Sequence, residues 1–359
     1  MRILIATDAW SPQINGVVVA LANTIARLRE WGHKVEVVSP EGFMTVPMPT
    51  YPEIPLALLP GREVARRIRE FDPDTLHIAT EGPIGNAARR FCLHRGLRFT
   101  SAYHSCFPEY VKPRAGIPLA WSYAWMRRFH SASSAILVAT ETMRTQLEQR
   151  RFERLAVCTL GVDLDLFHPV EERFTDLPRP VFTYVGRVAI EKDLPAFLRL
   201  ELPGTKLVVG DGPARAKLQR KFPDARFVGY KTGKELASYF QRSDAFVFPS
   251  RTDTFGLVML EAMACGVPVA ALPVRGPIDV VTDPAAGVLD CDLRRAALAA
   301  LELDREGPRR HAQKYPWEQS CRQFLACMVP VNERVQQNGH TPVISLQPGA
   351  CAPANKESA

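Results

Sequence analysis

The chain has 359 residues, of which 46% are hydrophobic and 23% charged, a composition typical of a globular protein large enough for two domains. No apolar run approaches the roughly 20 residues that span a bilayer, and the N-terminus lacks the charged leader and cleavage site of a signal peptide, so we expect a cytoplasmic protein. The eight cysteines form no C-x2-C pair, which argues against a structural zinc site, and the net charge of +7 can attract phosphate-rich partners.

The first half of the chain alternates apolar strands with amphipathic helices. Residues 2–7 predict a strand, 8–16 a loop, 17–31 a helix and 34–39 the next strand. Further strands are expected at 75–78, 99–103 and 135–138, whereas the proline-rich residues 45–61 predict an irregular connector. Repeated βαβ units indicate a parallel, doubly wound sheet, and we expect residues 1–165 to form a Rossmann-like domain.

A second series of βαβ units begins at Pro180. Its strands lie in the segments VFTYVGR, KLVVGDG, ARFVGY, AFVFPS and PVAAL. We therefore predict a linker at 166–179 and a second Rossmann-like domain at 180–315. Residues 316–330 predict a final helix, and residues 331–359, rich in Gln, Asn, Pro and Gly, predict a disordered tail.

Two carboxylates flank a glycine turn in the second half. Asp253 follows the strand that ends at Phe248, and Glu261 lies in a helix that begins near Leu257. Small ligands bind at the carboxyl ends of strands in open α/β sheets, and a helix N-terminus favours a phosphate. The segment therefore predicts a nucleotide-sugar site.

The same segment resembles the E-x7-E signature of retaining glycosyltransferases of family 4, which have the GT-B architecture of two Rossmann-like domains facing across a cleft. Asp253 stands where the first Glu is usual. Four other elements of the family follow in order along the chain: Asn15-Gly16, His104, Gly186-Arg187…Lys192 and Gly210-Asp211-Gly212-Pro213. The resemblance covers residues 1 to about 317.

The resemblance implies roles for these residues. Arg187 and Lys192 would stabilise the charge of a departing diphosphate, Asp253 would lie near the donor sugar, and Glu261 would accept the ribose hydroxyls. The remaining donor-binding candidates lie in loops and at strand ends: Asn15, Gly16, Gly210, Gly212, Phe227, Gly229, Phe255, Gly256, Leu257 and Val258. His104, by resemblance, would hold the sugar and the acceptor, although a lone histidine can also be structural. No metal or other cofactor is expected, because fixed cations can replace a metal and no D-x-D pair stands in a suitable loop.

The segment 103–130 bears on the acceptor. Trp121, Trp125 and Phe129 recur every four residues beside Arg127 and Arg128, a pattern that suits an anionic bilayer surface or a helix packed on its own domain. The segments YHSCFPEYV and TEGPIG resemble the sulfoquinovosyl- and glucosyl-diacylglycerol synthases. We therefore expect transfer of a hexose from a nucleotide-diphosphate sugar, a UDP-sugar in preference to a GDP-sugar, to a lipid such as diacylglycerol, by an enzyme bound peripherally to the inner face of the membrane.

Three alternatives remain open from the sequence. The first is a mannosyl- or glucosyltransferase acting on a soluble or polyprenyl-linked saccharide. The second is a non-catalytic binder of nucleotide-sugars or nucleic acid, although we expect no nucleic-acid partner. The third is a phosphorylase of the same architecture, which usually carries pyridoxal phosphate in a far longer chain.

Overall fold

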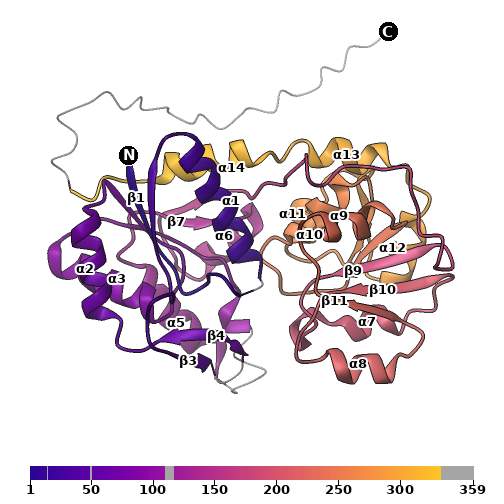
Figure 1. The fold of residues 1–359 in the computed structure, drawn as a ribbon, viewed down its shortest axis with the longest axis horizontal. Helices are drawn as coiled ribbons and strands as arrows, with labels where there is room; N and C mark the ends of the chain where they lie inside the picture. Colours follow the sequence, from indigo (N-terminus) through magenta and orange to yellow (C-terminus); the bar gives the residue numbers. More distant parts are fainter. Residues whose placement is uncertain (14, 49–50, 110–116, 333–359) are drawn as a thin grey trace, which may run out of the picture.

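The computed structural model describes residues 1–13, 15–48, 51–109 and 117–332, and Figure 1 shows two α/β units side by side. The predicted tail from 333 to 359 lies outside these residues. The fold class expected from the sequence is confirmed, because each unit is a six-stranded parallel sheet covered by helices.

The first sheet has the strand order β2-β1-β5-β6-β7-β8. Its strands are β1 (Arg2–Ala6), β2 (Lys34–Val38), β5 (Thr75–Ile78), β6 (Thr100–Ala102), β7 (Ile136–Val138) and β8 (Leu155–Val157). The helices of this unit are α1 (Gly16–Glu30), α2 (Gly61–Phe71), α3 (Pro83–Arg95), α5 (Leu119–His130) and α6 (Glu141–Gln149). The inner strands are buried on both faces, as parallel sheets require.

The second sheet has the order β11-β10-β9-β12-β13-β14. Its strands are β9 (Val181–Val185), β10 (Thr205–Val209), β11 (Arg226–Gly229), β12 (Ala245–Phe248), β13 (Val269–Ala271) and β14 (Gly287–Leu289). From β9 the strands β10 and β11 are added on one side, and β12, β13 and β14 are added on the other. The loops that follow β9 and β12 therefore meet at the switch point where such folds bind ligands.

Helices surround the second sheet and join it to the first unit. They are α7 (Leu194–Leu198), α8 (Arg215–Lys221), α9 (Gly233–Gln241), α10 (Leu257–Ala264), α11 (Pro277–Val280), α12 (Leu293–Ala300), α13 (Glu306–Ala312) and α14 (Trp317–Cys327), with a 3₁₀ turn η1 (Ile190–Lys192). Helix α14 returns to the first unit and lies along α1 (Figure 1), where Glu318 pairs with Arg27 at 3.0 Å.

Most of the described residues of the proline-rich segment 45–61 lie in strands, so the prediction of an irregular connector is wrong. It forms an antiparallel ribbon of β3 (Thr45–Met48) and β4 (Tyr51–Ala57), in which Pro47 stands opposite Pro55. A two-stranded ribbon leaves an open edge on each strand, where a residue without an N–H costs no ladder bond.

Two other segments differ from the expected organisation. Phe167 and Phe174, in the predicted linker, are buried in the core of the second unit. Val331, placed in the tail, is also buried, and its N–H donates to the carbonyl of Asp74 at 2.9 Å. The ordered chain therefore continues past residue 330.

Candidate active site

The switch point of the second sheet brings Lys192 and Asp253 together. Lys192 ends η1, after β9, and Asp253 lies in the loop after β12. The ammonium of Lys192 forms an ion pair with Oδ1 of Asp253, and both side chains are largely buried. The second oxygen, Oδ2, is buried without a partner among the described residues. The pair therefore keeps an unused acceptor atom beside a cation.

Arg187 lies in the same loop, two residues after β9, and is half-buried. Its backbone carbonyl accepts a hydrogen bond from the hydroxyl of Tyr184 at 2.9 Å. This bond fixes the loop that carries both predicted phosphate-binding cations.

The Gly210-Asp211-Gly212-Pro213 turn packs directly on that loop. A Cβ on Gly210, which has φ +144°, would lie 1.9 Å from the carbonyl oxygen of Gly186. A Cβ on Gly212 would lie 2.6 Å from the carbonyl oxygen of Val188. The close approach seen here is between two loops of the protein, and a role for these glycines in donor binding stays a prediction.

The amino end of α10 has no side-chain cap among the described residues. Gly256 precedes the helix with φ +90°, and no side chain caps the first turn. The side chains of Phe255 and Leu257 are buried, whereas Val258 is half-buried. The N–H of Met259 donates to the carbonyl of Gly256 at 2.9 Å, which leaves the N–H groups of Leu257 and Val258 and the positive end of the helix dipole to interact with an anion.

Glu261 lies one turn further along α10. Its side chain is half-buried, and burial raises the pKa of its carboxyl to about 7. No described side chain pairs with this carboxylate. Partial burial of a carboxylate without a protein partner is unfavourable, and hydroxyl donors from a ligand would offset part of that cost.

Phe227 and Gly229 end the neighbouring strand β11. Phe227 is half-buried, and the carbonyl of Gly229 accepts from the N–H of Gly210 at 2.8 Å. Gly229 therefore borders the Gly210 turn, and a role for Phe227 and Gly229 near the base of a nucleotide stays a prediction.

Asn15 and Gly16 face α10 from the other unit. The side chain of Asn15 caps α1 by accepting from the N–H groups of Val17 and Val18, both at 3.0 Å. A Cβ on Gly16 would lie 4.0 Å from Cδ1 of Leu257. Capping of α1 therefore accounts for Asn15. Gly16 lies where the N-termini of α1 and α10 approach each other.

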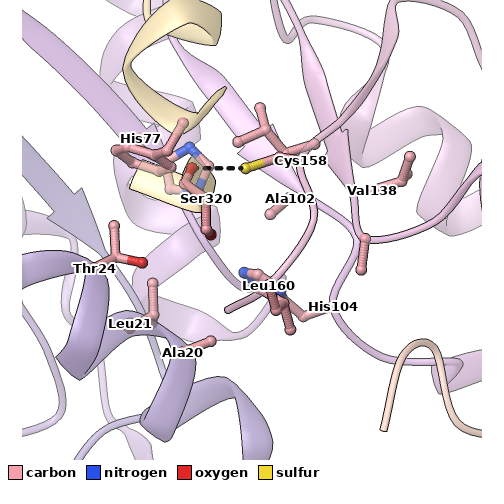
Figure 2. A pocket seen from close by; sticks show the side chains of 13 residues that line it. Ala20, Leu21, Thr24, His77, Ala102, His104, Val138, Cys158, Leu160 and Ser320 are labelled. Carbon is pink, nitrogen blue, oxygen red and sulfur yellow. Dashed lines mark hydrogen bonds between the residues drawn. The ribbon is translucent and has the colours of Figure 1, made fainter. Parts of the chain in front are cut away.

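His104 follows β6 and joins the two units through its backbone. Its carbonyl accepts a hydrogen bond from the hydroxyl of Thr254 at 2.8 Å. Its ring lines a small cavity of about 30 Å³ that His77 also lines (Figure 2). Burial lowers the pKa of His104 to about 4, so the imidazole is neutral at pH 7.

The sequence reasoning missed several residues that join the units. Arg275, after β13, donates to Oε1 of Gln146 at 2.6 Å and to Sγ of Cys106 at 2.9 Å. Asp279 accepts from the N–H of Thr142 at 3.2 Å. The only available signal was position, because Arg275 and Asp279 follow a strand of the second sheet at its carboxyl end.

Helix α5 exposes its tryptophans. Trp121 is 74% exposed and Trp125 is 44% exposed, whereas Phe129 is buried and does not share their surface. Arg128 is exposed, and Arg127 is half-buried with Nη1 donating to the carbonyl of Arg150 at 3.1 Å. The predicted aromatic and basic face therefore consists of the two tryptophans and the arginines.

Two searches of the described residues bear on metals and membranes. No group of three or more His, Cys, Asp or Glu side chains in this part of the chain is arranged to hold a metal ion. In the same residues, no helix has both the length and the apolar character to cross a bilayer.

Comparison with known proteins agrees with this geometry. The family description Glycosyltransferase Family 4 matches residues 14–166, and Glycosyl transferases group 1 matches residues 179–303. A GDP-mannose-dependent alpha-mannosyltransferase of Mycobacterium tuberculosis is 30% identical over 319 residues, covering 80% of this chain and 83% of that protein.

A plant relative and a solved structure extend the comparison. The sulfoquinovosyl transferase SQD2 of Arabidopsis thaliana is 27% identical over 355 residues, covering 85% of this chain and 68% of that protein. Sucrose-phosphate synthase from Thermosynechococcus elongatus superposes with a TM-score of 0.69 at 18% identity, covering 90% of this chain and 96% of that one. The last likeness concerns the fold.

Proposed function

This chain belongs to glycosyltransferase family 4 and is an enzyme that uses a nucleotide-sugar donor, and we propose that it transfers a hexose to a membrane lipid with retention of anomeric configuration. The observation that carries the proposal is the Lys192–Asp253 pair beside the uncapped N-terminus of α10. Asp253 lies three residues before Gly256, so the pair and the N-terminus of α10 belong to one loop, and a cation and a helix dipole on one loop would favour an anion.

The diphosphate of the donor would occupy that position. Negative charge grows on the diphosphate as the glycosidic bond breaks, and Lys192, Arg187 and the first turn of α10 would stabilise it. These groups come from the chain itself, so the proposed mechanism needs no metal. Lys192 would exchange its bond to Asp253 for the phosphate, which frees Asp253 for the sugar hydroxyls.

The nucleoside and the sugar would extend in opposite directions from the diphosphate. Glu261 would accept the ribose hydroxyls. Gly16 and His104 would close on the sugar from the first unit, with the Thr254 bond holding the closed arrangement. In the retaining reaction proposed here, the acceptor attacks from the side of the departing phosphate, which takes the acceptor proton.

GDP-mannose is the first donor to test, because the name of the Mycobacterium tuberculosis relative specifies it. UDP-sugars are the second set, as expected from the resemblance to diacylglycerol glycosyltransferases. The roles proposed for Glu261 and Lys192 concern the ribose and the diphosphate, which both kinds of donor contain, so they do not distinguish uridine from guanosine.

The exposed aromatic face of α5 supports a lipid acceptor. Tryptophans enter the interface between lipid headgroups and water, and adjacent arginines attract anionic lipids. Trp121 and Trp125 would hold the enzyme on the cytoplasmic surface of the membrane. The other candidate is a mannosyltransferase acting on a saccharide acceptor, and the relative that uses GDP-mannose favours it.

Mass spectrometry of products tests the proposal. The full chain is incubated in EDTA with GDP-mannose or UDP-sugars, and with either diacylglycerol vesicles or oligosaccharides. A glycosylated lipid that Lys192→Ala abolishes would support the proposal. A glycosylated saccharide alone would replace the lipid acceptor, and no product from any donor in the absence of metal would contradict the mechanism.

Vesicle binding tests the face of α5 separately. Trp121→Ala/Trp125→Ala should release the protein from anionic vesicles, whereas Trp31→Ala, at another exposed tryptophan, should not. Equal binding by both variants would contradict a role for α5.

A further inference from the structure

Helix α5 carries an exposed face that changes from apolar to basic along its length. Trp121, Ala124, Trp125 and Arg128 are all exposed, and their spacing of i, i+3, i+4 and i+7 places them on one face. The helix buries its opposite side, through residues that include Tyr123 and Met126. The exposed stripe therefore runs from the tryptophans to Arg128.

This stripe ends in a hollow of about 490 Å³ on the protein surface. Ala124 lies in both the stripe and the wall of the hollow, so the two are continuous. Ile136 and Phe152 line it together with one acidic residue, Glu153. Ser131 and four arginines complete the lining, the arginines being Arg127, Arg128, Arg151 and Arg154.

The four arginines outnumber the single acidic residue of the lining, so the hollow has an excess of positive charge. Arg127 donates to the carbonyl of Arg150, and Arg154 donates to the carbonyl of Ser131. Across the described parts of the chain, the ion pairs found include no carboxylate partner for any of the four. Like charges held close together repel one another, and a bound anion would relieve that repulsion.

The hollow is separate from the active site. Ile136 begins β7, and Arg154 immediately precedes β8. Both therefore stand at the amino ends of the strands, whereas His104 follows the carboxyl end of β6. An anion in the hollow cannot be the diphosphate of the donor.

We propose that the hollow binds the phosphate headgroup of an anionic glycerophospholipid while Trp121 and Trp125 enter the bilayer interface. Guanidinium groups fork onto phosphate oxygens, and a tryptophan face beside them suits a lipid surface better than a free phosphate or a nucleic acid. The proposal rests on the membrane docking proposed above and adds a specific lipid site to it.

Flotation of the full chain with phosphatidylglycerol vesicles tests the site, with phosphatidylcholine vesicles as reference. Arg128→Gln/Arg151→Gln should raise the lipid concentration for half-binding about 30-fold, at about fivefold for each arginine. Arg128→Lys/Arg151→Lys should recover only part of this loss, because lysine cannot fork onto phosphate. Arg62→Gln/Arg199→Gln removes two exposed arginines from other surfaces and should change binding less than twofold.

The outcomes separate the site from general charge attraction and from the proposed function. Full binding by the lysine pair, or equal loss in the Arg62/Arg199 control, would overturn the site. Loss only in Trp121→Ala/Trp125→Ala would overturn the site and leave membrane docking intact.

Displacement from vesicles by millimolar inorganic phosphate, or equally tight binding of single-stranded nucleic acid, would overturn the lipid assignment. Turnover of a detergent-dispersed acceptor should stay unchanged in the glutamine pair, since the hollow lies away from the cleft.

Discussion

The hydroxyl of Thr254 donates a hydrogen bond of 2.8 Å to the backbone carbonyl of His104, 150 residues away in the chain. This bond joins the acidic loop after β12 to the loop after β6, so it spans the cleft between the two units. The bond therefore holds the loop that carries His104 against the loop that carries Asp253.

We expect Thr254→Val to lower kcat/KM about fivefold, because one neutral hydrogen bond contributes about 1 kcal/mol. The variant should also show a larger radius of gyration by small-angle X-ray scattering. Thr205→Val is the matched control, since that hydroxyl donates to the carbonyl of Pro178 at 2.7 Å, away from the cleft. Equal effects of the two variants would show that the Thr254 bond does not support closure.

Lys192→Ala should reduce kcat about 100- to 1,000-fold, the loss typical of one group that stabilises developing charge. Nucleotide release measures this effect directly. Lys231→Ala removes a lysine of the same unit that pairs with Glu235 on the surface, and it should keep nearly full activity. A Lys192→Ala enzyme with normal kcat would contradict the proposal that the diphosphate binds beside Lys192.

Donor affinity should depend on the ionisation of Glu261, whose pKa burial raises to about 7. In the proposed mode of binding the carboxylate accepts the ribose hydroxyls, and it becomes protonated as pH falls through this pKa. The KM for the donor should therefore rise about tenfold from pH 8 to pH 6, because the fraction of enzyme with an ionised Glu261 falls by that factor. Glu261→Gln should have a high KM that is flat over this range, and a flat KM in the unsubstituted enzyme would exclude Glu261 from donor binding.

Arg275→Met should open the cleft by removing the bonds to Gln146 and Cys106. Cys106 is buried, and burial raises the pKa of its thiol to about 12. We expect maleimide to modify Cys106 at least fivefold faster in the variant, as measured by peptide mapping. Arg295→Met breaks an exposed pair with Asp290 and should leave the rate unchanged. A rate unaffected by Arg275→Met would show that other contacts keep the cleft closed.

The protein should lose stability in mild acid because two histidines are buried in neutral form. Burial lowers the pKa of His77 to about 3 and that of His104 to about 4, from an ordinary value of 6.5. Below pH 6.5 the unfolded chain binds protons that the folded chain does not, so the free energy of unfolding falls. Each histidine contributes about 1.4 kcal/mol per pH unit between 6.5 and its folded pKa.

Denaturant unfolding at pH 7 and pH 5 measures this dependence. The free energy of unfolding should differ less between pH 7 and pH 5 in His77→Gln, by the contribution of one histidine. His94→Gln, at the exposed end of α3, should leave that difference unchanged. An unchanged difference in His77→Gln would mean that carboxylates dominate acid unfolding.

The meeting of the candidate donor-binding loops was predictable because it depends on topology. A parallel sheet places the loops after β9 and β12 at one edge, so Lys192 and Asp253 had to lie near each other once both strands were identified. The Lys192–Asp253 ion pair itself was not predictable, because the side-chain packing decides which acid each cation meets.

Local patterns were less informative where packing on a neighbour decides the outcome. Phe129 shares the four-residue spacing of Trp121 and Trp125, yet it is buried while they are exposed. Eight residues turn a helix by more than two full rotations, so Phe129 has drifted toward the core. The prolines of 45–61 predicted irregular structure, because the sequence does not reveal that a partner strand lies alongside.

The sequence by itself determined the two α/β halves, their boundaries in outline and the kinds of residue at the donor site, because hydrophobic periodicity and turn residues act over a few positions. Only the tertiary structure decided which residues meet across the cleft, as Thr254 meets His104 and Arg275 meets Cys106. It also decided that Arg151 and Arg154 join Arg127 and Arg128 around one hollow. Such contacts depend on how two independently folded sheets and their helices pack, and no local pattern in the chain specifies that packing.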